Sequence, residues 1–179
     1  MELLSYQGLI QRLRELDEEA SLRFGLAERL SLIIVGGSAL VLMEYITRGT
    51  HDIDAMEASK QLEDLLADYD INMNVQTYIN NFPYNYLDRV EPLPFKGKII
   101  DFYTASLEDI VIAKLYSYRD KDYEDICSPQ VLRAIDWKKL HFLATSDDEA
   151  KASALNEYRY REFLSRFEEY ERRYRPCGN

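Results

Sequence analysis

Two aspartates separated by one residue are the first feature of the sequence that could do chemistry. Asp52 and Asp54 flank Ile53 in the run Arg48-Gly49-Thr50-His51-Asp52-Ile53-Asp54. On a β-strand, residues i and i+2 point to the same face, so the two carboxylates would stand side by side. Adjacent carboxylates repel unless a cation lies between them, and Mg²⁺ prefers such oxygen ligands together with waters and substrate phosphates. The pair predicts a Mg²⁺ site, although Asp-X-Asp alone also occurs on solvated strand faces and in turns.

A glycine pair precedes the aspartates and supplies a different chemistry. The apolar run Leu32–Val35 is typical of a buried strand, and it ends at Gly36-Gly37-Ser38. Glycines at that point leave backbone N–H groups open to the close approach of a phosphate. Ser38 adds a hydroxyl donor and is a good N-cap for a helix through about Tyr45. Gly-Gly alone marks a turn, but together with the aspartates it indicates a site for nucleoside triphosphate.

A third carboxylate lies in a later predicted strand, Lys98–Tyr103. Asp101 stands within Ile-Ile-Asp-Phe-Tyr, where a buried and unpaired carboxylate would be costly. If this strand is a neighbour of the one that carries Asp52 and Asp54, Asp101 completes a two-metal site.

Lys114 is the only charged residue between Asp109 and Arg119, on the apolar face of a predicted helix. Such a lysine either extends its amine to solvent or meets an anion. Beside a metal–triphosphate site, that anion would be a phosphate oxygen.

The elements that must position these residues follow from hydrophobic periodicity and capping signals. They predict an α/β core over about residues 30–126 with helices at both ends. For domain organisation, we expect residues 1–130 to form one domain with an N-terminal helix, and residues 131–179 to form a helical C-terminal extension packed on it. The expected helices are 3–23, 38–45, 58–69, 106–118, a short one from 122 and 155–174, and the expected strands are 32–35, 47–57 and 98–103.

Composition limits the classes of function. The chain has 179 residues, 46% of them hydrophobic, and a formal net charge of −10. It therefore lacks the overall positive charge that attracts nucleic acid, and any nucleotide site must contain cations of its own. Cys127 and Cys177 form no disulfide framework. No apolar run is long enough to span a membrane, so we expect a soluble, cytoplasmic protein without a membrane partner.

Two further features have open readings. The tyrosines from Tyr78 to Tyr86 could stack a base or pack over the sheet. The C-terminal segment is the one basic zone, a contact for RNA or an acidic partner, or else a solvated helix face. Its arginines are Arg159, Arg161, Arg166, Arg172, Arg173 and Arg175.

Taken together, these motifs resemble a known family. Gly36-Gly37-Ser38-Ala39-Leu40 followed by Arg48-X-Thr50-X-Asp52-Ile53-Asp54 is similar to the signature of minimal nucleotidyltransferases of the DNA polymerase β superfamily. The similarity is greatest to the AbiEii-like branch associated with bacterial toxin–antitoxin and abortive-infection systems. Glu108–Leu115 and Arg119–Ile126 resemble the downstream helical motif of that branch.

The resemblance implies a nucleotidyltransferase fold, a mixed β-sheet flanked by helices. It implies Asp52 and Asp54 as metal ligands, and Asp101 as the third carboxylate that ligates metal or deprotonates the attacking hydroxyl. Lys121 and Asp122 would lie at the rim of the active site, although Asp122 is also a candidate helix N-cap. The residues expected to bind nucleotide are Gly36, Gly37, Ser38, Arg48, Thr50, Lys121 and Asp122, with Lys114 on the phosphates.

The leading hypothesis is a Mg²⁺-dependent enzyme that moves a nucleoside monophosphate from a nucleoside triphosphate to a hydroxyl of RNA, such as a tRNA end, or of a protein. The alternative is a non-catalytic module on the same fold that binds a cognate toxin or antitoxin protein. A metal phosphoesterase is less favoured, because the sequence lacks the histidine-rich ligand sets that such sites often use.

Overall fold

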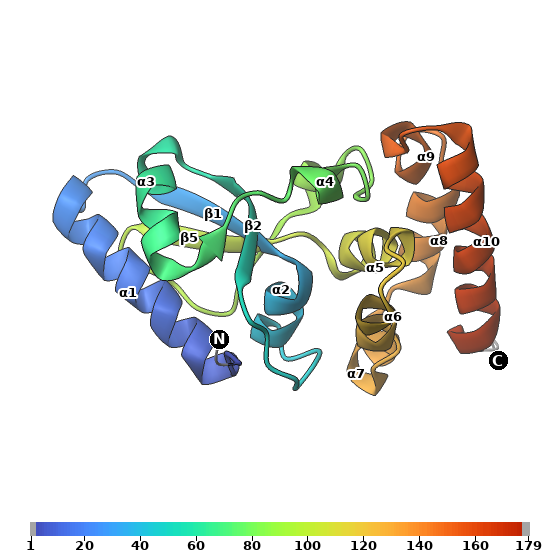
Figure 1. Cartoon of the computed structure of the whole chain (residues 1–179), viewed down its shortest axis with the longest axis horizontal. Helices are drawn as coiled ribbons and strands as arrows, with labels where there is room; N and C mark the ends of the chain where they lie inside the picture. The colour runs from blue at the N-terminus through green and yellow to red at the C-terminus, as the bar shows by residue number, and fades with distance from the viewer. Residues whose placement is uncertain (1–2, 177–179) are drawn as a thin grey trace. The chain divides into compact units, whose positions relative to one another are not determined.

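The computed structural model describes residues 3–176, apart from the side chains of Gln76 and Thr77, and divides the chain into two compact units (Figure 1). The first unit runs to Gln76 and includes Val90–Ala105. The second consists of Thr77–Arg89 and the chain from Ser106 onward.

The first unit is built on a mixed five-stranded sheet with the order β3-β2-β1-β5-β4. β1 pairs antiparallel with β2 and parallel with β5, β2 pairs parallel with β3, and β4 pairs antiparallel with β5. A mixed sheet accompanied by helices confirms the predicted fold class. The elements are α1 (Tyr6–Phe24), β1 (Leu30–Val35), α2 (Gly36–Leu42), β2 (Ile53–Ala58), α3 (Glu63–Leu66), β3 (Ile71–Asn72), β4 (Glu91–Pro92) and β5 (Ile100–Thr104), with 3₁₀ turns η1 (Lys60–Leu62) and η2 (Ala67–Tyr69) on either side of α3.

The two faces of this sheet differ in burial. Along β1 and β5, residues directly opposite each other in the parallel register share a face. One face carries the fully or almost fully buried side chains Leu32, Ile34 and Phe102. The opposite face, which we call the open face, carries partly or fully exposed residues, among them Ser31 and Tyr103. Alternation of this kind is the burial pattern of a sheet with one face packed on a core.

A β-bulge in β2 decides which residues of that strand reach the open face. Ile33 pairs with Glu57, but the next residue, Ile34, pairs with Ala55, so Met56 is the extra residue. Past the bulge, Ala55 is fully buried and Asp54 lies opposite Val35. A regular ladder would have given the opposite result, because the side-chain period is 2 and a shift of one residue exchanges the faces.

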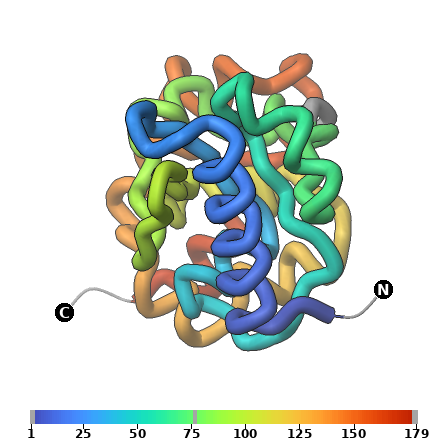
Figure 2. The backbone as a smooth tube through the Cα atoms, turned by 90° about the vertical axis from the view of Figure 1, so that its left-hand side faces the viewer, coloured from blue at the N-terminus to red at the C-terminus, as the bar shows by residue number. Residues whose placement is uncertain are grey.

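Helix α1 lies on one side of the sheet, where Figure 2 shows it in front of the strands. Leu9, Leu13, Leu16 and Ala20, spaced at about one per turn, are all fully buried, which confirms the helix expected over residues 3–23. The buried Asp17 ties this helix to the start of β5, because its carboxylate accepts hydrogen bonds from three consecutive backbone N–H groups. They are those of Lys98, Ile99 at 3.0 Å and Ile100 at 2.9 Å.

The second unit is helical among its described residues. Helix α10 confirms the helix expected over residues 155–174, and its apolar side chains Phe163, Phe167 and Tyr170 are buried. Phe163 stacks on Tyr116 with ring centroids 4.1 Å apart, which packs α10 on α5. The elements are α4 (Gln76–Ile79), which begins at the join between the units, η3 (Tyr86–Arg89), α5 (Leu107–Tyr116), α6 (Asp120–Ile126), α7 (Pro129–Ala134), α8 (Trp137–Thr145), α9 (Ala150–Ser153) and α10 (Glu157–Tyr174).

Two helix caps differ from the sequence prediction, while a third is confirmed. Ser106 caps α5 and accepts a hydrogen bond from the N–H of Asp109, at the start expected for the helix over residues 106–118. Helix α2, however, begins two residues before Ser38, whose buried hydroxyl donates to the carbonyl of Val35 at 3.0 Å. Asp122 lies inside α6, whose N-cap is Arg119, because its carboxylate is used in a buried ion pair.

None of the helices in residues 3–176 is long and apolar enough to cross a membrane. Cys127 is a free thiol, and Cys177 lies outside the described residues.

The carboxylate of Asp17 predicts a test of the fold. Replacing Asp17 by Ala leaves three backbone N–H groups near the start of β5 without their acceptor, so we expect the free energy of unfolding to fall by at least ~3 kcal/mol. Its neighbour Glu18 forms an exposed ion pair with Lys98, and Glu18→Ala should cost less than ~1 kcal/mol. Urea denaturation of both variants measures the difference, and equal losses would contradict this role of Asp17.

Candidate active site

Three strand ends meet at one edge of the sheet in the first unit. β1 ends at Val35 and runs directly into α2, while β2 and β3 both begin at this level. The register places Asp54 opposite Val35 on one side and opposite Asn72 on the other. The glycine turn and a carboxylate, distant in sequence, are therefore neighbours. We call this region the β1/β2 edge.

Asp54 is held at the β1/β2 edge by two neighbours. Its Oδ1 accepts a hydrogen bond of 3.1 Å from Nδ2 of Asn72. Its Oδ2 lies against Gly36, where a Cβ atom would stand only 3.3 Å from that oxygen. Gly36 also has a φ of +70°, a conformation that L side chains rarely adopt. Glycine is thus required here both by the turn and by the nearness of the carboxylate.

The loop that leads into β2 is organised by Arg48 and Thr50. The guanidinium of Arg48 lies 3.3 Å from the position of a Cβ on Gly37 and donates to the carbonyl of Gly49 at 3.1 Å. The hydroxyl of Thr50 donates to the carbonyl of Asp52 at 3.2 Å. The structure therefore places Gly36, Gly37, Arg48 and Thr50 around the start of β2.

Asp52 completes the set at the β1/β2 edge. It immediately precedes β2 and is exposed, while Ile53 between it and Asp54 is fully buried. This exposed–buried–half-exposed order agrees with the predicted alternation. Across the described residues, no three His, Cys, Asp or Glu side chains gather in a way that would hold a metal ion. Two carboxylates are nevertheless a donor set that fits Mg²⁺ in a nucleotide site, since substrate phosphates and waters supply its remaining ligands.

Asp101 does not lie at the β1/β2 edge. It is on the open face, as Asp54 is, but it pairs with Ser31, four residues along β1 from Val35. At about 3.3 Å per residue this corresponds to about 13 Å. Its carboxylate instead forms an ion pair with Arg29, whose Nε lies 3.1 Å from Oδ2 and whose Nη2 contacts Oδ1. The hydrogen bonds from Arg29 lower the pKa of Asp101 below its usual value.

Lys114, in the second unit, meets carboxylates and not a free phosphate site. Its amine is buried and lies 2.6 Å from Oδ1 of Asp122 and 2.8 Å from Oδ2 of Asp125. Ser117 and Arg119 donate to the other oxygen of Asp122 at 2.7 and 2.6 Å. Of the two alternatives for Lys114, the structure favours an anion as partner, and that anion belongs to the protein.

The charges around Asp122 decide its protonation. Burial by itself would raise the pKa of Asp122, but Lys114, and then Ser117 and Arg119, lower it below the usual value. The carboxylate is therefore ionised as the partner of Lys114. Lys121, by contrast, is exposed on α6.

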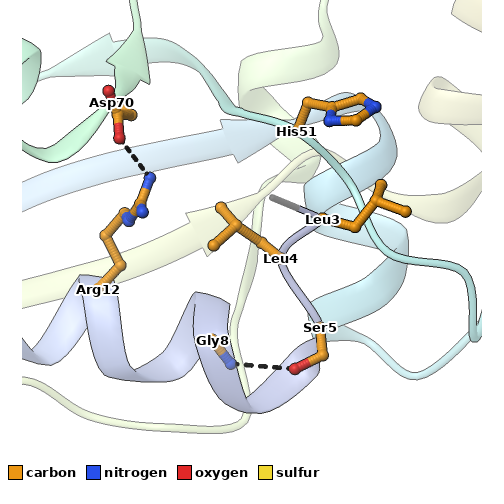
Figure 3. A pocket seen from close by; sticks show the side chains of 7 residues that line it. All are labelled: Leu3, Leu4, Ser5, Gly8, Arg12, His51 and Asp70. Atoms are coloured by element: carbon orange, nitrogen blue, oxygen red, sulfur yellow. Dashed lines mark hydrogen bonds and ion pairs between the residues drawn. The ribbon is translucent and has the colours of Figure 1, made fainter. Parts of the chain in front are cut away.

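A small pocket lies in the first unit beside the loop that contains Asp52. Figure 3 shows His51 and Leu3 on one side and the ion pair of Arg12 with Asp70, at 2.7 Å, on the other. Its volume is about 310 Å³. Asp70 has a left-handed backbone, with φ of +52°, at the turn into β3. The residues lining the pocket are Leu3, Leu4, Ser5, Gly8, Arg12, His51 and Asp70.

Sequence reasoning missed Asn72, Arg29 and this pocket. Asn72 and Arg29 act through strand pairings that no local signal announces, since β3 has only two residues. The start of α1 at Ser5 forms one wall of the pocket and is indicated by the sequence. The other wall comes from residues 51 and 70, which are distant in sequence.

Comparison with known proteins gives one match. A family model named DUF6036 and described as a nucleotidyltransferase of unknown function matches residues 11–175. The match spans most of the chain, so the chain belongs to this family. Neither the curated proteins nor the solved structures contain a match to it.

The buried pair of Lys114 with Asp122 and Asp125 predicts a loss of stability on substitution. Lys114→Met removes the buried cation that Asp122 and Asp125 share, which should lower the free energy of unfolding by about 3–5 kcal/mol. Lys121→Met, on the exposed side of α6, should change it by less than ~0.5 kcal/mol. Denaturant titration of the two variants is the measurement, and a Lys114→Met protein as stable as wild type would show that the network is not structural.

Proposed function

From this family membership and the β1/β2 edge, we propose that the chain is a Mg²⁺-dependent nucleotidyltransferase that moves a nucleoside monophosphate from a nucleoside triphosphate to a hydroxyl acceptor. The observation that carries the proposal is the convergence of Asp54, the Gly36 turn and the loop of Asp52 at one sheet edge. Such a site has two requirements. It needs carboxylates that can hold a cation, and it needs a turn that a phosphate can approach closely.

In this proposal Asp52 and Asp54 hold Mg²⁺, which on binding withdraws charge from the phosphates and favours attack at phosphorus. Asn72 positions Asp54 through its hydrogen bond to Oδ1. The backbone at Gly36 and Gly37 lies beside Asp54 and Arg48, which suits a phosphate next to both a carboxylate-bound cation and a guanidinium.

The reaction exchanges one phosphorus–oxygen bond for another. The acceptor hydroxyl forms a bond to the α-phosphorus and loses its proton, the bond between the α-phosphorus and the bridging oxygen breaks, and pyrophosphate leaves. The two-carboxylate set at the β1/β2 edge supports one firmly held cation. We do not assign a second metal or the hydroxyl's proton to Asp101, because of its ion pair with Arg29.

The acceptor class and biological setting follow from the resemblance of the sequence motifs to the AbiEii-like branch. On that basis we place the activity in a bacterial toxin–antitoxin or phage-defence system within the cytoplasm, with RNA or a protein as acceptor and a cognate toxin or antitoxin protein as partner.

One observation favours a second candidate. Within the described part of the chain, the edge carries two clustered carboxylates and not three. A site with a missing ligand is what a non-catalytic module would retain, so the alternative is a toxin or antitoxin component that binds a partner protein without transferring a nucleotide.

Label transfer tests the two candidates. The purified chain is incubated with Mg²⁺ and each α-labelled nucleoside triphosphate, together with total tRNA, with cell lysate, or with neither. We expect Asp52→Asn/Asp54→Asn to reduce labelling at least ~10³-fold, because several kcal/mol of charge stabilisation are lost with the cation.

Asp101→Asn is the matched control, since it removes a carboxylate from the same open face but away from the β1/β2 edge. It should retain labelling within a few-fold of wild type. Labelling that survives the double substitution would refute the site. Labelling that is lost in Asp101→Asn would show that the reaction needs Asp101 as a third carboxylate. Absence of labelling under every condition would favour the non-catalytic module.

A further inference from the structure

The helical unit carries a surface cluster of two exposed tyrosines and two half-buried arginines. Tyr118, in the connection between α5 and α6, and Tyr158, in the first turn of α10, are 60% and 70% exposed. The two rings bond to the same carboxylate and so form one aromatic patch, and it is a patch, not a single exposed residue, that indicates a binding surface. We define the Tyr/Arg cluster as Tyr118, Tyr158, Arg159, Glu162 and Arg166.

The two rings of the cluster are held in place through their hydroxyls. Tyr118 and Tyr158 both donate to the carboxylate of Glu162, at 2.5 and 2.9 Å, one to each oxygen. Glu162 is the only acidic member of the cluster, and both of its oxygens are used by these hydroxyls. The rings are therefore fixed in orientation while much of their surface remains exposed, which lowers the entropy that a stacking ligand would have to remove.

Two guanidinium groups lie over the ring of Tyr118. The guanidinium carbons of Arg166 and Arg159 are 5.0 and 5.6 Å from its centroid, within the range of cation–π contacts. Their hydrogen bonds go to neutral acceptors, with Arg166 donating to the carbonyl of Ser117 and Arg159 to the carbonyl of Tyr116. Arg119, the residue after Tyr118, makes a similar contact, because its guanidinium carbon lies 5.3 Å from the ring centroid of Tyr78.

The arginines of the cluster are not neutralised by direct ion pairs. Within the described residues, neither Arg159 nor Arg166 forms a salt bridge, whereas Arg161 and Arg175 on the same helix each pair with a glutamate four residues away. The cluster thus has two arginines and one glutamate, a local positive charge on a chain whose net charge is −10. An anionic ligand that also has flat apolar faces fits this chemistry, and nucleic-acid bases and phosphates provide both.

We propose that the Tyr/Arg cluster binds single-stranded nucleic acid, with bases stacked on Tyr158 and on the surface of Tyr118 that the guanidinium groups leave exposed, and phosphates beside Arg159 and Arg166. Single-stranded substrate is required because the rings need unpaired base faces. If the proposed nucleotidyltransferase function holds, on which this last step rests, the acceptor is the end of a single-stranded nucleic acid and not a protein side chain.

Fluorescence anisotropy with a labelled oligouridine, an oligothymidine and a duplex of the same length tests the proposal without nucleotide or Mg²⁺. We expect binding to the single strands and weaker binding to the duplex. Tyr118→Ala should weaken binding about tenfold, the loss that corresponds to one stacked base. Tyr118→Phe keeps the ring and should stay within a few-fold of wild type. Tyr84→Ala removes an equally exposed tyrosine of the same unit outside the cluster and should bind as wild type does.

Salt dependence gives a second readout that a folding defect would not produce. Arg166→Gln should reduce the slope of log affinity against log salt by about 0.7, the value for one phosphate contact on a single strand. Arg161→Gln, at an arginine already paired with Glu157, should leave the slope unchanged. Absence of binding up to ~100 µM, the weak end of non-specific affinities, would overturn the proposal, and so would equal binding by wild type and Tyr118→Ala.

The same assay separates this proposal from the proposed function. Asp52→Asn/Asp54→Asn should bind the oligonucleotides as wild type does, since neither residue belongs to the cluster. Oligonucleotide binding without any label transfer would support the nucleic-acid-binding surface and contradict the proposed enzyme activity. Label transfer to a protein without oligonucleotide binding would support the enzyme activity and contradict the nucleic-acid-binding surface.

Discussion

The register between β1 and β2 is the constraint on which the candidate site depends. The bulge at Met56 places Asp54 opposite Val35 and turns its carboxylate to the open face, while Ala55 moves to the buried face. Because side chains alternate with a period of 2, a regular ladder would have buried the carboxylate beneath the sheet. Bulges are known to re-aim side chains next to active sites, and this one does so for the residue that meets Gly36. The glycine turn then follows as a requirement, because any Cβ at Gly36 would press on Oδ2 of Asp54.

Much of this arrangement could be predicted from the sequence, because it depends on local signals. The apolar spacing of α1 and α10, the strand that ends at Gly36-Gly37 and the cap at Ser106 are each fixed by a few consecutive residues. The alternation of Asp52, Ile53 and Asp54 was predictable for the same reason, and the structure shows Ile53 buried between its exposed and half-exposed neighbours. The family match, to a family described as a nucleotidyltransferase of unknown function, agrees with the coarser level of the resemblance that the motifs carry.

Where the structure places a side chain differently from the sequence prediction, the cause is a partner that comes from another element. Asp101 matches a third carboxylate by its position in a predicted strand, but its level in the sheet is set by the parallel register of β5 with β1, and Arg29 bonds to its oxygens. Asp122 has the spacing of an N-cap, but its carboxylate forms an ion pair with the buried Lys114 on α5. Ser38 has the spacing of a cap as well, yet the helix begins at Gly36, because glycine can adopt the conformation that the turn needs.

The central claim is that Asp52 and Asp54 hold a divalent cation together with a nucleoside triphosphate at the β1/β2 edge. The most direct test is electron paramagnetic resonance of Mn²⁺, titrated with protein in the presence of a non-hydrolysable nucleoside triphosphate. Our account predicts that wild-type protein removes free Mn²⁺ from solution in an analogue-dependent manner, and that Asp52→Asn/Asp54→Asn does not, although it remains folded. Equal Mn²⁺ binding by both proteins, or no binding by wild type at any analogue concentration, would contradict it.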